Sequence, residues 1–199
     1  MDNAIDINKG EKINLQKVSP GIKVARIGAM WNKNKVVNGH PFDIDISVVC
    51  IDANGQAFGT PGFVFYKNLK NENGSIIVTK DNRTGEGDGY DEEAFIKFDS
   101  VPAAVKSIYV CASIAMFITR KQNFGQIDGA KIDMYNEDTR ERLISFDLTE
   151  DMSSGAGCKC IRFMRETDGS WSYKAVGEIV QGGLKGILNG FGLDVIGEE

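Results

Sequence analysis

Carboxylate side chains are concentrated in one short stretch of this 199-residue chain. Residues 81–93 contain six acidic residues and a single base, Arg83, which gives the stretch a net charge of −5. Subtracting them from the 28 acidic and 23 basic residues of the chain leaves 22 of each, so the whole charge imbalance lies here. Carboxylates at this density repel one another unless a cation lies among them. The stretch therefore predicts a cation site.

Calcium is the cation that these residue types favour, because it takes six to eight oxygen ligands from carboxylates, amides and backbone carbonyls. Asp81 and Glu92 stand at the first and twelfth positions, as in an EF-hand, but Arg83 and Glu86 do not fit its interior. We expect a calcium loop of another kind, lying between strands. A solvated connection without an ion fits the composition equally well.

A second acidic pair strengthens the calcium interpretation. Asp43 and Asp45 are two residues apart in an apolar run, so a strand would place both on one face. If that face points toward residues 81–93, the pair would complete a shared cage of oxygen atoms. Such pairs are also common on the solvent faces of strands.

The other residues whose side chains could take part in a reaction or bind a metal have simpler interpretations. Cys158 and Cys160 would share a strand face and could bind a soft metal or act as a reductant, but small apolar core residues are the simpler interpretation. Cys50 and Cys111 lie in apolar runs and are expected in the core. His40 is the only histidine, and no nucleophile motif accompanies it, so we expect an ordinary loop histidine and no enzyme.

Short strands separated by turn signals must position these residues. We expect an all-β, two-sheet sandwich, formed by one domain over residues 12–199 after a flexible tail over 1–11. Apolar residues at helical spacing over 178–191 predict a short C-terminal helix packed on a sheet. The expected strands are 12–15, 22–30, 44–51, 62–66, 75–79, 94–99, 106–114, 130–136, 141–147, 159–165 and 171–177.

Composition excludes several classes of protein. No apolar run is long enough to span a membrane, and the N-terminus lacks the features of a signal peptide. Four cysteines without a C-x-x-C motif argue against a disulfide framework or structural zinc, so a reducing cytoplasm is the simplest location. A net charge of −5 and a pI of about 5.1 disfavour nucleic acid as a partner.

Several motif segments follow one another along the chain. They are Gly-Ala-Met-Trp at 28–31, Phe-Asp-Ile-Asp at 42–45, Phe-Val-Phe-Tyr-Lys-Asn-Leu at 63–69, Asp-Asn-Arg-Thr-Gly-Glu-Gly-Asp-Gly at 81–89, Gln-Asn-Phe-Gly-Gln at 122–126, and the glycine-rich end at 175–192. In this order they resemble the TerD family of tellurium-resistance and stress-response proteins, and the resemblance covers residues from about 12 to 195. Three positions depart from the family pattern: Met30 replaces a glycine, Asp128-Gly129 replaces a polar residue and Asn, and Tyr90 stands where the family often has Asp.

The resemblance implies a calcium-binding β-sandwich that holds two ions and acts in resistance to tellurite and other toxic stress. It also implies a bacterial, cytoplasmic protein that works through other resistance proteins in a membrane-associated complex at the inner membrane. By motif, the implied oxygen donors are Asp43, Asp45, Asn68, Asp81, Asn82, Asp88, Asp91 and Glu92.

Two alternative functions remain open. A metal-dependent hydrolase could use the acidic cluster to activate water, although no general base is evident. A calcium-dependent module for membranes or carbohydrates would need aromatic or basic residues beside the metal, where only Arg83 and Tyr90 qualify.

Overall fold

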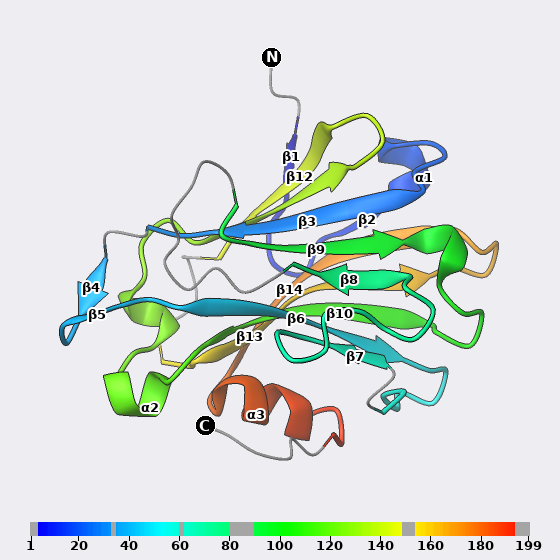
Figure 1. Cartoon of the computed structure of the whole chain (residues 1–199). Helices are drawn as coiled ribbons and strands as arrows, with labels where there is room; N and C mark the ends of the chain where they lie inside the picture. The colour runs from blue at the N-terminus through cyan, green and yellow to red at the C-terminus, as the bar shows by residue number, and fades with distance from the viewer. Residues whose placement is uncertain (1–3, 33–34, 60–61, 80–89, 149–153, 194–199) are drawn as a thin grey trace.

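Two six-stranded sheets packed face to face form the body of the protein (Figure 1). The computed structural model describes residues 4–32, 35–59, 62–79, 90–148 and 154–193. Sheet A has the strand order β1-β12-β11-β3-β9-β8, and sheet B has the order β2-β14-β13-β10-β6-β7. Strands β4 and β5 form a separate hairpin. The predicted two-sheet sandwich is therefore confirmed.

The strands are β1 (Ile5–Asp6), β2 (Lys12–Asn14), β3 (Val24–Met30), β4 (Val36–Val37), β5 (His40–Pro41), β6 (Ile44–Ile51), β7 (Phe63–Val64), β8 (Ile76–Val78), β9 (Glu92–Lys97), β10 (Ser107–Ile114), β11 (Lys131–Asn136), β12 (Glu141–Asp147), β13 (Gly157–Arg165) and β14 (Trp171–Val180). The helices are α1 (Leu15–Val18), α2 (Phe117–Arg120) and α3 (Gly183–Asn189), with 3-10 turns at Phe98–Ser100 and Phe124–Gln126. Every strand expected from the sequence has a counterpart here. The strands that the sequence did not reveal, β1, β4 and β5, have two residues each.

The N-terminal segment differs from the expected flexible tail over 1–11. Strand β1 pairs in parallel with β12, where Ile5 lies opposite Ile144. Ile7 follows it, is 5% exposed in the main core, and donates its backbone N–H to the Ser145 carbonyl at 3.0 Å. These residues are therefore part of sheet A, because one apolar side chain and a few backbone hydrogen bonds outweigh the turn-forming residues around them.

Two cores explain the burial pattern of β6. Ile44, Ile46 and Val48 face the main core between the sheets, whereas Val49 and Ile51 belong to a second cluster with Leu188 of α3. Both faces of the later part of β6 are therefore covered. A continuous apolar run replaces the alternation typical of a strand with one solvated face.

The C-terminal helix is shorter than the predicted helix over 178–191. Strand β14 continues to Val180, and its last residues pair with β13, where Gly157 lies opposite Val180. The helix begins only at Gly183, whose φ of +56° is typical of a turn, and it packs on the outer face of sheet B. Residues 178–180, at the start of the predicted helix, form a strand because pairing with β13 satisfies the hydrogen bonds of their backbone groups.

No helix in the described ranges combines the length and the apolar composition needed to cross a bilayer.

Candidate functional site

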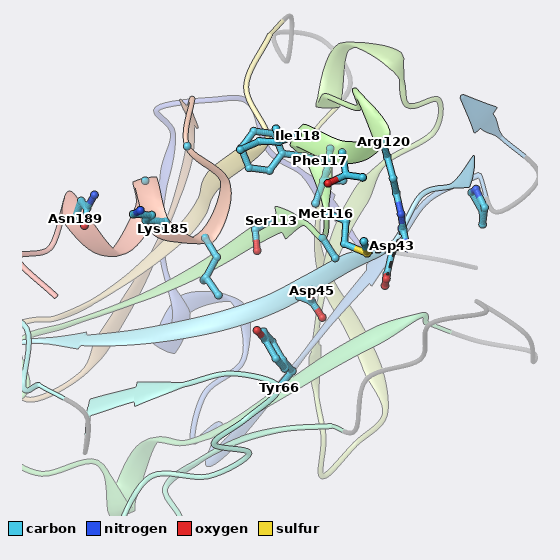
Figure 2. A pocket seen from close by; sticks show the side chains of 17 residues that line it. Asp43, Asp45, Tyr66, Ser113, Met116, Phe117, Ile118, Arg120, Lys185 and Asn189 are labelled. Carbon is cyan, nitrogen blue, oxygen red and sulfur yellow. Dashed lines mark hydrogen bonds and ion pairs between the residues drawn. The ribbon is translucent and has the colours of Figure 1, made fainter. Parts of the chain in front are cut away.

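Asp43 and Asp45 lie on the outer face of sheet B, where β6 begins. The strand alternation that turns Ile44 and Ile46 inward turns these carboxylates outward, and both line a pocket beside α2 and α3 (Figure 2). Asp43 Oδ2 is 3.7 Å from Arg120 Nη1, and each of these side chains is less than one-fifth exposed. The predicted placement of both acids on one strand face is confirmed.

Asn68 holds the turn that follows β7. Its Nδ2 donates to the Phe63 carbonyl at 2.7 Å, and its backbone exchanges hydrogen bonds with Phe65 at 2.8 and 3.0 Å. Tyr66 in the same turn lines the pocket that contains Asp45 (Figure 2). Asn68 is therefore tied to the end of sheet B at which the two acids lie.

Asp91 and Glu92 are buried at the start of β9 in sheet A. Each residue is 3% exposed, and the Asp91 N–H donates to the Ala29 carbonyl at 3.0 Å. Glu92 shares its strand face with Ala94 and Ile96, which belong to the main core, so it faces the space between the sheets. Glu92 and the outward-facing acids of β6 thus point into different spaces.

The described residues do not assemble a complete metal cage. Within them, no group of three or more His, Cys, Asp or Glu side chains could hold an ion. The predicted donors Asp81, Asn82 and Asp88 lie outside the described residues. All eight predicted donors carry oxygen atoms, which are the hard ligands that calcium takes. The donor chemistry of the predicted residues therefore fits calcium.

Tyr90 is a residue whose importance the sequence did not reveal. Its ring covers Gly28 so closely that a Cβ added there would lie 2.3 Å from Tyr90 Cγ. Its hydroxyl donates to Asp133 Oδ2 at 2.6 Å and lies 2.6 Å from the Tyr135 hydroxyl. Burial, followed by the hydrogen bonds that the hydroxyl forms with these two partners, raises the pKa of Tyr90 strongly. The end of the acidic stretch is thus anchored on the outer face of sheet A.

Asp133 is the centre of this anchor. It is 1% exposed, and its Oδ2 also accepts from Arg142 Nη1 at 3.1 Å. Beside it, Arg26 lies over the Tyr135 ring at 4.6 Å and pairs with Glu93 at 3.0 Å. A buried carboxylate needs partners of this kind. No sequence pattern indicated this role, because Asp133 alternates in β11 with the core residues Ile132 and Met134 and so occupies a position typical of a solvent-facing residue.

The thiols and the histidine take no part in a site among the described residues. All four cysteines are buried and unbridged, and burial raises the pKa of Cys50 to about 12. Cys160 is fully buried beside Cys158, and burial raises its pKa well above the ordinary value. Thiols of this kind are inert, so the core interpretation is confirmed. His40 is exposed in β5.

Comparison with known proteins identifies the family. A family model described as the TerD domain matches residues 3–191. General stress protein 16U of Bacillus subtilis is 38% identical, and tellurium resistance protein TerD of Alcaligenes sp. is 37% identical; each match covers 96% of this chain and 98% of the relative.

A solved structure has the same fold. The crystal structure of a homologue of telluride resistance protein TerD from Streptomyces coelicolor superposes with a TM-score of 0.68 at 17% identity. The match covers 82% of this chain and 94% of the solved chain. At that identity the likeness supports the fold, while the family model and the relatives above carry the assignment. The resemblance of the motif segments is therefore confirmed, and this chain belongs to the TerD domain family.

Proposed function

We propose that the protein binds calcium through its acidic residues and acts in a bacterial stress or tellurite response, without catalysis, by presenting a calcium-dependent surface to protein partners. The family membership and the names of the relatives support the stress and resistance setting. We place the protein in the cytoplasm, with other resistance proteins in a membrane-associated complex as its partners. Two ions are expected, because the described donors occupy two separate spaces.

The burial of Asp91 and Glu92 carries this proposal. Both carboxylates are 3% exposed, and they follow directly on the most acidic part of the chain. Moving carboxylates out of water is costly unless hydrogen bonds or cations compensate. A divalent cation would offset the net charge of this region, in addition to the contacts that these two carboxylates make within the protein.

The donor set assigns roles within the site. Asp43 and Asp45 would supply carboxylate oxygens from the outer face of sheet B at the start of β6, and Asn68 would supply its amide oxygen from the adjacent turn. Calcium would supply positive charge that cancels the −5 of residues 81–93. The change in the local field from negative to neutral or positive is what a partner would recognise.

Titration calorimetry tests the metal. We expect heat with calcium and weaker binding of magnesium, which requires a stricter octahedron. Asp45→Asn should weaken calcium binding, whereas Asp138→Asn, an exposed aspartate on the turn between β11 and β12, should leave it unchanged. The absence of heat at millimolar calcium, or equal affinity for magnesium, would contradict the proposal.

Affinity capture from a bacterial lysate tests the surface. The wild-type protein should retain partners in calcium and lose them in chelator, and the double variant Asp43→Asn, Asp81→Asn should behave as the chelated protein does. Identical partner sets in both conditions would contradict a calcium-dependent surface. Hydrolysis of a phosphate or glycosidic ester that is lost in the same double variant would favour the hydrolase instead.

A further inference from the structure

A pocket on the outer face of sheet B has the size of a small-molecule site. It lies between α2 and α3, with β6 and β10 beneath it, and its volume is about 570 Å³ (Figure 2). Ligand sites in proteins commonly measure about 300–1,000 Å³ and combine apolar walls with a few polar groups. This pocket has that composition, because Ile114, Phe117 and Leu184 line it together with charged side chains.

The apolar wall is held in place by close packing and by an unusual backbone. A Cβ added at Gly183 would lie 2.8 Å from Phe117 Cε1, so the α2 ring rests directly on the start of α3. Met116 and Lys121, which flank α2, both have φ of +53°, a conformation that residues other than glycine adopt at a cost. The same turn leaves Met116 51% exposed and Ile118 54% exposed at the pocket rim.

Two cationic side chains line the pocket and lack full partners. Lys185 forms no ion pair or hydrogen bond with any residue in the described part of the chain, and Asn189, one helical turn further along α3, lies on the same wall. On the other side, Arg120 Nη1 is buried without a hydrogen-bond acceptor among the described residues, and its distance to Asp43 is 3.7 Å. Figure 2 shows Lys185 and Asn189 on α3 and Arg120 beside Asp43 across the pocket.

We propose that this pocket binds an amphipathic organic anion, a carboxylate or phosphate group attached to a hydrocarbon body. Lys185 and Asn189 donate hydrogen bonds to the anionic head, and Phe117, Leu184 and Met116 cover the body. The same pocket contains Asp43 and Asp45, which are predicted metal ligands, but neither the α3 donors nor the apolar wall belongs to those ligands. Binding in the presence of a chelator therefore tests the anion site without a metal ion in the pocket.

The test is titration of the full chain with decanoate in chelator, followed by amide and methyl NMR shifts. We expect saturable shifts confined to α2, α3 and the ends of β6 and β10. Each methylene added between octanoate and decanoate should tighten binding about fourfold if the chain is buried. Decylammonium has the same body with the opposite charge and should bind more weakly. Tighter binding of decylammonium, or shifts scattered over the surface, would overturn the proposal.

Variants separate the head from the body. Lys185→Gln should weaken the binding of decanoate about fivefold, which is the upper range for an exposed ion pair. Lys97 is an exposed lysine on sheet A, and Lys97→Gln should leave the affinity for decanoate unchanged. Leu184→Asn should remove the dependence on chain length. Equal losses from both lysine variants would overturn the proposal, since they would indicate attraction to overall charge.

Vesicles distinguish a free anion from a membrane lipid as the source of the ligand. Sedimentation with phosphatidylglycerol vesicles, compared with phosphatidylcholine vesicles and repeated with Lys185→Gln, reports a lipid that enters the same pocket. Binding to phosphatidylglycerol vesicles without any binding of monomeric decanoate would overturn the proposed pocket site. Attraction between the protein surface and the anionic membrane would then explain the vesicle binding.

Discussion

Replacing Tyr90 by phenylalanine isolates the hydroxyl that anchors the end of the acidic stretch. The ring would stay over Gly28, but the 2.6 Å bonds to Asp133 and Tyr135 would be lost. A hydrogen bond to a charged group contributes about 1.5–3 kcal/mol, and Asp133 would keep Arg142 as its remaining partner. We therefore expect Tyr90→Phe to lower the free energy of unfolding by about 2 kcal/mol.

Urea unfolding and thermal melting measure this loss. For a chain of this length, about 2 kcal/mol corresponds to a fall in Tm of roughly 4–8 °C. Tyr66→Phe is the matched control, because the Tyr66 hydroxyl has no hydrogen bond within the described ranges, and it should change stability by less than about 0.5 kcal/mol.

A double-mutant cycle assigns the loss to the carboxylate. If the Tyr90 hydroxyl acts through the charge of Asp133, Tyr90→Phe should cost less than about 1 kcal/mol in the Asp133→Asn background. The reasoning is refuted if Tyr90→Phe is as stable as the wild type, or if its cost is the same in both backgrounds.

Four further outcomes follow from the structure. Gly28→Ala should destabilise by about 1–3 kcal/mol because its Cβ meets the Tyr90 ring, and Tyr90→Ala should relieve part of that loss; unchanged urea unfolding would contradict this clash. Ellman's reagent should label none of the four buried thiols of the native protein and all four in denaturant, and rapid native labelling would show that the core opens. Burial raises the folded-state pKa of Cys160 and Tyr173, so the unfolded chain releases these protons first, and stability should fall as pH rises above about 8.5; urea titrations at pH 8 and 10 would show a loss of about 2 kcal/mol per buried thiol. Calcium should raise Tm relative to chelator, since a ligand at a hundredfold excess over Kd adds about 2.7 kcal/mol, and coincident melts would contradict a coupled site.

The sequence by itself determined the strand pattern and the donor chemistry. A continuous apolar run predicted β6 to the residue, and the alternation of apolar and polar residues predicted β12 to the residue. The concentration of charge in residues 81–93 and the Asp43–Asp45 pair are properties of composition and spacing, so they needed no coordinates.

Only the tertiary structure decided which of these residues meet. The position of Glu92 in the core, opposite the outward-facing Asp43 and Asp45, depends on which strand face each sheet turns inward. The start of α3 at Gly183 depends on a pairing between β13 and β14. The Tyr90 anchor joins Tyr90 to Asp133 and Tyr135, which lie more than 40 positions further along the chain. Contacts across this separation are set by sheet register and packing, which local propensity does not encode.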